Sequence, residues 1–429
     1  MNDVVIIAAI VMLVCMFLKV PVFVSVLAGS VTYFTMTPDA SAQLIAQRFT
    51  SGMESVPLLA VPFFICAGVF MNYSGITGRI MDFCAVLTGR MAGGLAQVNI
   101  LLSTLMGGLS GSNIADAAME AKMLVPEMEK NGLPRVFSTV VTAFSSIITP
   151  LIPPGIQMII YGTLSNVSIG KIFMAGISVG ALTCLVMMAG TMVISKKRGY
   201  KPLRTTGVSP NEFFRSFIKA SLPLCLPVII IGGIRVGVFT PTEAGAVAVI
   251  YAVLLGLVYK DLNLKGSLAA IKETVITTGS IALIIGSAAV FAWILTKERV
   301  PQTLTAMMVA GISNKYVFLI VVNLFLLIVG MFIEGTAATI VLTPLLAPIA
   351  AAFGINEVQF TFIFIFNLSI GCITPPMGVL MFVTCGITGC KTRDFLKEAV
   401  PYFAMLLVVL LLVTFVPAVS VGIVDLLYQ

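Results

Sequence analysis

Two long stretches of this sequence share one pattern of glycine and proline breaks within apolar sequence. The first runs from Gly107 to Gly155, beginning GGLSGSNIAD and ending TPLIPPG, and the second runs from Gly330 to Gly378, beginning GMFIEGTAAT and ending ITPPMG. In apolar surroundings, such breaks free backbone groups that must find hydrogen bonds within the protein. Paired, interrupted apolar segments in two halves of a chain indicate the binding site of a transporter. The breaks recur at an offset of 222 residues, with Pro126, Gly132, Pro153 and Pro154 matched by Pro348, Gly354, Pro375 and Pro376.

The composition and the position of charge define the class of protein. The chain is 59% hydrophobic and 10% charged, with a mean hydropathy of +1.10, whereas soluble domains carry about 25% charged residues. This predicts a polytopic integral membrane protein in contact with lipid. The net charge of +7 is concentrated between Lys196 and Lys219, where seven basic residues accompany one acid. A short basic loop between apolar spans is typical of the cytoplasmic side, so we expect no nucleic-acid partner.

Residue usage argues against several kinds of chemistry. The eight cysteines show no CxxC spacing and the chain has no histidine, so neither a disulfide framework nor a zinc site is predicted. The GLSG sequence around Ser110 resembles intramembrane serine proteases, but the usual histidine base is missing and no lysine lies in an apolar span nearby. Asp116 has no aspartate partner in a corresponding motif, and no phosphate-binding GxxxxGK[ST] loop is present. We therefore predict that the chain is not an enzyme.

The order of apolar segments predicts an all-α polytopic membrane protein made of two inverted-topology repeats. Each repeat contains a re-entrant helical hairpin, at residues 93–131 and 315–353, followed by a broken transmembrane helix. Because a hairpin adds no net crossing, each repeat crosses the membrane five times, and an odd number inverts the second repeat. The predicted boundaries are residues 1–195 for the first repeat, 196–216 for a basic cytoplasmic loop and 217–429 for the second repeat.

The start of the chain leaves an alternative open. Val4–Leu18 and Val22–Met36 are short apolar runs, which form either two tilted crossings or one long broken helix. A polar, amphipathic stretch from Pro38 to about Thr50 is expected to lie along the membrane surface. In the second repeat, Thr277–Leu295 is expected to form a separate crossing.

The broken helices suit a site for an ion and an anion. A helix interrupted in mid-membrane ends with unpaired carbonyls and restarts with unpaired N–H groups, which suit Na⁺ and a carboxylate respectively. Proline also leaves the carbonyl four residues back without its helical donor. The alternative is that the glycines only permit close packing and the prolines only kink their helices. The candidates are Ser110, Ser112, Asn113, Thr149 and Pro150 in the first half, and Gly335, Thr336, Thr339, Gly371, Thr374, Pro375 and Pro376 in the second.

Six segments carry a resemblance to a known family. They are Pro57–Met71, Gly107–Met119, Thr149–Gly155, Pro241–Val249, Phe291–Gln302 and Thr374–Gly378. With them, essentially the whole chain resembles the large membrane subunit of tripartite ATP-independent periplasmic (TRAP) transporters, the DctM-like permeases. The resemblance implies Na⁺-driven import across a bacterial inner membrane by an elevator mechanism. It also implies a small membrane subunit, expected here as a separate chain, a periplasmic substrate-binding protein, and an organic anion such as sialic acid, a C4-dicarboxylate or a sugar acid.

The resemblance further implies where the working parts lie. Scaffold helices are expected at 1–52 and 217–275, and transport parts at 57–195 and 277–429. The implied Na⁺ ligands are Ser110, Ser112, Asn113, Thr149, Pro150, Gly330, Gly335, Gly371, Thr374 and Met377. The implied substrate-binding residues are Asn113, Asp116, Pro154, Thr336, Pro375, Lys297 and Arg299.

Three of these assignments keep an alternative. Asp116 would repel a carboxylate, so a role in an ion site or in structure suits it better than direct contact. Lys297 and Arg299 either attract the carboxylate or place their charges at the membrane interface. A stand-alone Na⁺/dicarboxylate carrier, which needs no binding protein, is the alternative function.

Overall fold

The computed structural model describes residues 3–18, 20–37, 41–312 and 314–428, and within them the chain forms helices and loops without a β-strand. Eight of these helices are long and apolar enough to cross a membrane, and a bent pair, Gln43–Met53 with Pro57–Tyr73, raises the number to nine. The predicted all-α polytopic fold is therefore confirmed. Pro38, where the surface stretch is predicted to begin, lies outside the described residues.

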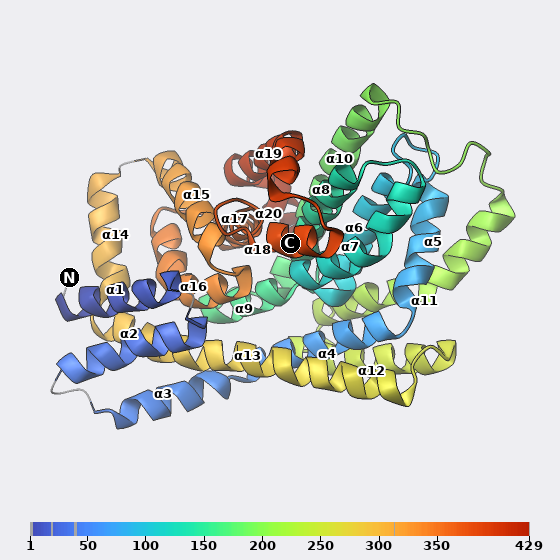
Figure 1. Cartoon of the computed structure of the whole chain (residues 1–429). Helices are drawn as coiled ribbons and strands as arrows, with labels where there is room; N and C mark the ends of the chain where they lie inside the picture. Colours follow the sequence, from blue (N-terminus) through green and yellow to red (C-terminus); the bar gives the residue numbers. More distant parts are fainter. Residues whose placement is uncertain (1–2, 19, 38–40, 313, 429) are drawn as a thin grey trace.

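The helices follow one another in the same order in both halves, as the colours of Figure 1 allow the reader to trace. The first half contains α1 (Asp3–Phe17), α2 (Val22–Met36), α3 (Gln43–Met53), the 3₁₀ helix η1 (Val56–Leu59), α4 (Ala60–Tyr73), α5 (Ile76–Thr88), α6 (Leu95–Ser110), α7 (Asn113–Lys130), α8 (Arg135–Ser145), the 3₁₀ helix η2 (Ser146–Leu151), α9 (Ile156–Ser165) and α10 (Ile169–Lys197). The second half contains α11 (Pro210–Arg235), α12 (Pro241–Tyr259), α13 (Leu264–Lys297), α14 (Val300–Gly311), α15 (Lys315–Phe332), α16 (Gly335–Ala352), α17 (Glu357–Gly371), α18 (Val379–Thr388), α19 (Thr392–Phe415) and α20 (Ala418–Leu427).

The two predicted hairpins are present as α6–α7 and α15–α16. Helices α7 and α16 each have 18 residues. The first residue of α16 lies 222 positions after the first residue of α7, and the same offset separates their last residues. Each hairpin is followed by a broken helix, in which α8, η2 and α9 correspond to α17 and α18. The predicted hairpins and breaks are confirmed.

The first hairpin opens toward the basic loop. Gly93 and Gly94 precede α6, and a Cβ added to them would lie 2.4 Å from Ser195 Oγ and 2.7 Å from the Leu203 amide nitrogen. Ser195 lies in the last turn of α10 and Leu203 in the loop that follows it. The open end of the first hairpin is therefore on the side that the positive-inside rule assigns to the cytoplasm.

The second hairpin opens at the other end, and α19 connects the two sides. At its start, Glu398 accepts a 2.5 Å hydrogen bond from Arg198 in the basic loop, and this bond raises the pKa of the Arg198 guanidinium. At its end, the ring of Phe415 lies 6.2 Å from that of Tyr316, in the first turn of α15. The hairpins thus open toward opposite ends, as inverted repeats require.

The largest difference between the halves is at α13. The sequence predicts a break before Thr277, but α13 runs unbroken over 34 residues, whereas its counterparts α3 and α4 are separated by a 58° bend. Pro57 lies at that bend and has no amide hydrogen. Its counterpart 222 positions on is Gly279, which keeps a backbone donor. This difference in one donor favours the continuous helix in the second half.

Two boundaries also differ from the sequence prediction. Helix α11 begins at Pro210 rather than at residue 217, with proline at its start and Glu212 in its first turn, two features that favour a helix N-terminus. The non-helical part of the basic loop is accordingly shorter than 196–216. The chain also continues past Tyr402–Val416, predicted as the last helix, into α20.

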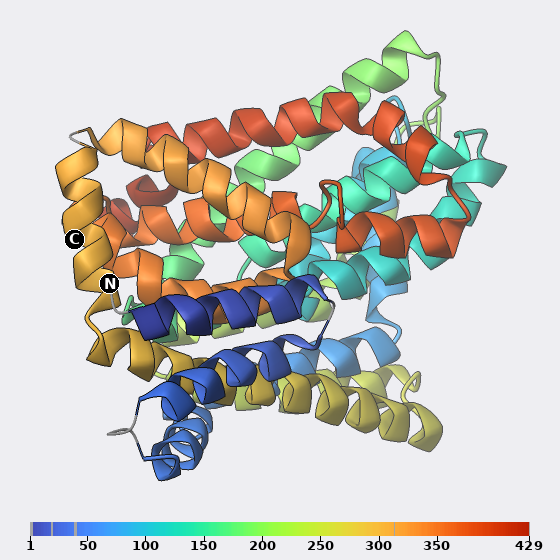
Figure 2. The ribbon, with the colours of Figure 1, turned by 60° about the vertical axis from the view of Figure 1, so that its left-hand side comes forward.

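Helices α1 and α2 form a separate small layer. Gly29 of α2 packs against the Ala8 carbonyl of α1, where an added Cβ would lie 2.7 Å from the oxygen. These two helices share a small core with the last turns of α13, including Val290 and Ile294. In Figure 2 they run side by side in opposite directions, beside α13. Of the two alternatives from the sequence, the structure therefore has two antiparallel helices.

Candidate functional site

A cavity of about 480 Å³ lies where the two hairpin tips approach α4 and α13. Ser110 to Ala115 line it from the first hairpin, and Glu334 and Thr336 line it from the second. Pro150 and Gln157 contribute from the first broken helix. The rest of the lining consists of residues of α4 and the middle of α13. Both repeats therefore contribute to one polar site inside an apolar protein.

Three helices begin at this cavity. Helix α7 begins at Asn113, α9 at Ile156 and α16 at Gly335, and the cavity is lined by residues in the first turn of each. The residues before α7 and α16 cap them in the same way. Ser112 Oγ accepts from the Ala115 amide (3.4 Å), and Glu334 Oε2 accepts from the Ala337 amide (3.0 Å). Helix N-termini carry partial positive charge and free N–H groups, so this site suits an anion.

The side-chain charges at the cavity have the opposite sign. Glu273 of α13 and Glu334 of the second tip line the cavity, and no lysine or arginine is among its described lining residues. Two carboxylates would repel a carboxylate ligand and attract a cation. The helix termini and the side chains thus favour ligands of opposite charge.

Two predicted residues at the cavity have buried polar atoms without a regular hydrogen bond. Ser110 and Asn113 are 8% and 5% exposed, Asn113 Nδ2 has no hydrogen-bond partner among the described residues, and Ser110 Oγ has only the nearby Asp116 carboxylate. Ser112, Pro150 and Thr336 also line the cavity, as predicted. A hydroxyl oxygen suits Na⁺, and an amide donor suits a carboxylate. A buried polar atom without a regular hydrogen bond is costly, so both atoms fit a site that a ligand completes.

Gln157 is a cavity residue that the sequence prediction missed. Its amide nitrogen lies so close to Gly335 that an added Cβ there would be 2.3 Å from Nε2. Gln157 is 3% exposed and its Oε1 has no partner among the described residues. Gly335, a predicted Na⁺ ligand, therefore leaves room for a side chain from the other repeat. The available signal was a lone glutamine two residues after a proline-rich break.

Asp116 and Thr149 lie behind the first tip rather than at the cavity. Thr149 Oγ1 donates a 2.9 Å hydrogen bond to Asp116 Oδ2, and both residues are fully buried. Neither lines the cavity described above. In this structure the hydrogen bond between Asp116 and Thr149 therefore connects the first tip to the first break.

A second buried carboxylate continues this polar region into the protein. Glu120 accepts from Ser103 Oγ (2.7 Å), which lies 2.9 Å from Ser145 Oγ. Ser145 Oγ donates to Asn99 Oδ1 (3.1 Å), and Asn99 Nδ2 donates to Thr142 Oγ1 (2.6 Å). Among the described residues, no lysine or arginine pairs with Glu120. An acid one turn after Asp116 in a membrane hairpin was the signal the sequence prediction passed over.

Gly330 and Gly371 form a close contact between helices. A Cβ added to Gly371 would lie 2.5 Å from Gly330 Cα, and one added to Gly330 would lie 3.0 Å from Gly371 Cα. Helices α15 and α17 thus touch backbone to backbone at these two residues. Both were predicted as Na⁺ ligands, and neither lines the cavity. Their geometry directly supports the alternative interpretation of close packing.

The remaining predicted residues of the two breaks lie outside the described cavity lining. Thr374 Oγ1 donates to the Ile370 carbonyl (2.7 Å), and the Thr374 carbonyl accepts from the Gly378 amide (3.1 Å). Pro375 and Met377 follow Thr374 in the segment between α17 and α18. At the first break, the Pro154 carbonyl lies against Gly111, where an added Cβ would be 3.0 Å away.

Lys297 and Arg299 do not line the cavity. The Lys297 ammonium lies 5.3 Å from the ring centre of Trp293 and 5.8 Å from that of Tyr33. Arg299 lies between α13 and α14, as the residue that precedes α14. A cation beside aromatic rings at a helix end fits the alternative, in which the charge lies at the membrane interface.

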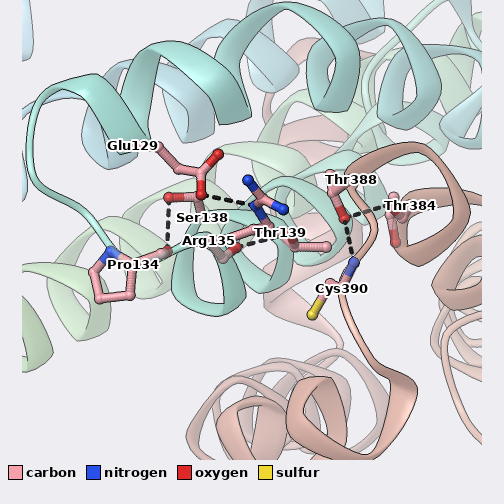
Figure 3. Close-up of polar contacts among 8 residues, drawn as sticks. All are labelled: Glu129, Pro134, Arg135, Ser138, Thr139, Thr384, Thr388 and Cys390. Carbon is pink, nitrogen blue, oxygen red and sulfur yellow. Dashed lines mark hydrogen bonds and ion pairs between the residues drawn. The ribbon is translucent and has the colours of Figure 1, made fainter.

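The open end of the first hairpin holds a separate polar cluster, shown in Figure 3. Arg135 Nε donates to Glu129 Oε1 (2.7 Å) across the turn between α7 and α8. The Cys390 amide donates to Thr388 Oγ1 (3.4 Å) in the turn after α18. These contacts stabilise turns and lie outside the cavity.

The fold and the site together define a membrane transport protein, because two opposed re-entrant tips meet at a buried polar site between membrane-spanning helices. A family model described as "Tripartite ATP-independent periplasmic transporter, DctM component" matches residues 9–419. The chain belongs to this family, and it is a multi-pass protein of the bacterial inner membrane. The predicted family is therefore confirmed.

Several named relatives match nearly the whole chain. The sialic acid TRAP transporter large permease protein SiaM of Vibrio cholerae is 40% identical over 403 residues, 94% of each chain. The C4-dicarboxylate TRAP transporter large permease protein DctM of Pseudomonas aeruginosa is 36% identical, over 92% of each chain. The sialic acid TRAP transporter permease protein SiaT of Haemophilus influenzae is 37% identical over 96% of this chain and 67% of its own length. The names of these relatives describe permeases and not enzymes.

A solved structure supports the fold alone. The crystal structure of the YdaH transporter of Alcanivorax borkumensis superposes with a TM-score of 0.64 over 88% of each chain, at 15% sequence identity.

Large permeases of TRAP transporters work with a small membrane subunit and a periplasmic binding protein. The permease DctMQ of Oleidesulfovibrio alaskensis, named for isethionate, is covered by this chain over 64% of its length.

Proposed function

We propose that this chain is the permease subunit of a Na⁺-coupled importer that moves a small organic anion by an elevator mechanism. One observation carries the proposal. The cavity between the tips combines three helix N-termini with two glutamates, Glu273 and Glu334, and no described lysine or arginine. The two carboxylates would repel an anion bound at the helix termini, and a cation bound beside the anion would offset this repulsion. Co-binding of Na⁺ supplies the missing positive charge, which links the two ligands energetically.

The chain offers groups for both ligands. Ser110 Oγ, Gln157 Oε1 and the carbonyls exposed at the tips are oxygens suited to Na⁺. Asn113 Nδ2 and the first amides of α7, α9 and α16 are donors suited to a carboxylate. The two sets lie around one cavity of about 480 Å³, which is within the range of small-molecule sites.

The named relatives support an acidic substrate. Their names give sialic acid, C4-dicarboxylates, isethionate and 2,3-diketo-L-gulonate, all of which are organic anions. We extend to this chain only the shared chemistry, a small oxyanion with polar substituents. A separate small subunit and a periplasmic binding protein complete the proposed importer.

An elevator motion is supported by how the site is divided. The two tips and α9 supply one part of the cavity lining, and α4 and α13 supply the rest. In the proposed cycle, the tip side carries both ligands past the α4–α13 side, so the proposal assigns α4 to the scaffold and not to the transport part that the resemblance implied for residues 57–195. The motion exposes the cavity first to one side of the membrane and then to the other.

Uptake into proteoliposomes tests the proposal. The permease would be reconstituted with its small subunit, and uptake of radiolabelled sialic acid, succinate and isethionate measured with the cognate binding protein. We expect one of these anions to accumulate under an inward Na⁺ gradient and not under an equal K⁺ gradient. Equal uptake in K⁺ would refute Na⁺ coupling. Strong Na⁺-driven uptake by the permease alone would favour the stand-alone carrier.

Two substitutions test where Na⁺ acts. Ser112→Ala and Thr374→Val each remove one neutral oxygen at a tip or break. Losing one interaction of about 1–1.5 kcal/mol lowers affinity roughly tenfold, so we expect half-maximal uptake at about tenfold higher Na⁺. Thr361→Val is the matched control for Thr374→Val, because its hydroxyl also bonds the carbonyl four residues back, but Thr361 lies within α17 and not at the break. An unchanged Na⁺ dependence in both variants would place the ions elsewhere.

A further inference from the structure

A second polar cleft, distinct from the transport cavity, lies between α5 and α11. It has a volume of about 410 Å³ and its lining includes Arg204, Arg215, Ser216 and Lys219. It adjoins the basic loop, because the Arg204 amide donates to the Gly89 carbonyl just after α5 (3.1 Å). The positive-inside rule places this cleft at the cytoplasmic surface of the membrane.

The cleft has an excess of positive charge. Three cations line it against two carboxylates, Asp82 and Glu212. Arg204 pairs with Glu212 at 2.6 Å, so that carboxylate is largely neutralised. Arg215 and Lys219 form no ion pair with any described carboxylate. Asp82 is the one acid that remains to oppose them, which leaves the cleft attractive to an anion.

Ser216 adds an independent sign of a ligand. It is 9% exposed and lines the cleft, and its Oγ has no hydrogen-bond partner among the described residues. A buried hydroxyl without a partner is costly unless a ligand or water satisfies it. Its position between Arg215 and Lys219 on α11 places a neutral donor beside two cations, an arrangement that suits a phosphate group.

An apolar stripe begins beside this cleft. Phe214, Ile218 and Leu222 of α11 are 63%, 63% and 44% exposed, and their four-residue spacing puts them on one face of the helix. Near the cleft, Phe83 of α5 packs against Phe217 of α11, with ring centres 5.9 Å apart. A cationic cleft at the membrane surface followed by an exposed apolar stripe matches a headgroup followed by an acyl chain.

We propose that this cleft between α5 and α11 binds the headgroup of an anionic phospholipid, whose acyl chain lies along the Phe214–Leu222 stripe. The phosphate accepts from Arg215, Lys219 and Ser216 Oγ. Because residues of both α5 and α11 line the cleft, the lipid contacts both helices. Basic pockets on the cytoplasmic side of membrane helices bind such headgroups.

Native mass spectrometry of the purified full chain tests the proposal with phosphatidylglycerol, and with phosphatidylcholine of the same acyl chains as the neutral comparison. Each cation near an anionic lipid contributes about a fivefold effect on binding, so R215Q/K219Q is expected to bind phosphatidylglycerol about thirtyfold more weakly. The matched control is K196Q/K197Q, which removes two exposed charges outside the cleft. We expect that control to change binding by less than about twofold.

A variant that is expected to bind more tightly distinguishes the loss of the site from misfolding, because misfolding would only weaken binding. E212Q releases Arg204 from its ion pair, so phosphatidylglycerol binding is expected to rise about fivefold. An equal loss in K196Q/K197Q would show diffuse surface charge in place of a site. Displacement of the lipid by excess inorganic phosphate would show a site for a soluble anion. Either result, or unchanged binding in R215Q/K219Q, overturns the proposal.

Discussion

Gly330 and Gly371 show how single residues determine the distance between two helices. The helices α15 and α17 approach until neither glycine has room for a Cβ. Small residues at such positions let membrane helices pack closely, and van der Waals contact is their main source of stability. Their backbone contact joins the second hairpin to the second broken helix.

Gly371→Ala is expected to destabilise the protein by about 1–3 kcal/mol, because the new methyl group would lie 2.5 Å from Gly330 Cα and the helices would have to separate. Gly386→Ala is the control, since an added Cβ there meets no atom within 4 Å. Thermal unfolding of the purified variants in detergent measures the difference. Equal melting temperatures for the two variants would contradict the close contact.

Single residues also show what the sequence was able to predict. Ser110, Asn113 and Thr336 were predicted at the cavity because polar side chains beside glycines are conspicuous within apolar sequence. Gln157 was missed because its partner, Gly335, lies in the other repeat, and its importance depends on a contact between distant segments. Both alternatives for Lys297 stayed open in the sequence, because a charge near the end of an apolar run gives no indication of the direction in which its side chain points.

At the scale of helices and hairpins, the offset of 222 residues predicted most of the architecture. Hairpins and breaks are encoded locally by glycine, proline and apolar runs, and these signals are strong in both repeats. The continuity of α13 was harder to predict, because a polar stretch and an apolar stretch join within one helix of 34 residues. The sequence difference that separates a broken helix from a continuous one is Pro57 in the first half against Gly279 in the second. Proline lacks the backbone N–H donor that glycine keeps.

The start of α16 gives a prediction at this scale, because Glu334 both caps the helix and lines the cavity. Glu334→Gln keeps an acceptor for the Ala337 amide and removes the charge, so its melting temperature is expected to stay near that of the unchanged protein. Its apparent affinity for Na⁺ is expected to fall about tenfold if the charge is worth about 1.4 kcal/mol. Glu334→Ala also loses the cap, which costs about a further 1 kcal/mol of stability.

Melting temperature and Na⁺-dependent uptake of both variants separate these two roles. If Glu334→Gln and Glu334→Ala lose the same stability and keep the same Na⁺ dependence, the carboxylate serves only the helix. If uptake by Glu334→Gln responds to Na⁺ as the unchanged protein does, the charge argument for Na⁺ coupling at this tip fails.

At the scale of the whole molecule, the arrangement depends on the inversion of the two repeats. In each hairpin, the first helix ends and the second helix begins at the tip, so the tip has both free carbonyls and free amides. One repeat brings its tip to the cavity from one side, and the other repeat brings its tip from the opposite side. Inversion therefore brings two similar tips together at the middle of the protein while their open ends face opposite directions. The sequence predicted this arrangement because each repeat makes an odd number of crossings, and the Arg198–Glu398 and Tyr316–Phe415 contacts agree with it.

The inversion leads to a prediction about which side of the membrane each loop faces. Lys201 lies in the basic loop beside the open end of the first hairpin, and Gly311 lies at the end of α14, just before the second hairpin. Both positions are exposed, and an added Cβ at Gly311 meets no atom within 4 Å. With the eight native cysteines replaced by alanine, Lys201→Cys and Gly311→Cys each provide one labelling site. A membrane-impermeant maleimide is expected to label residue 311 in right-side-out vesicles and residue 201 only in inverted ones. Uptake by the cysteine-free parent shows that the background still folds, and labelling of both positions from the same side would contradict the inverted arrangement of the repeats.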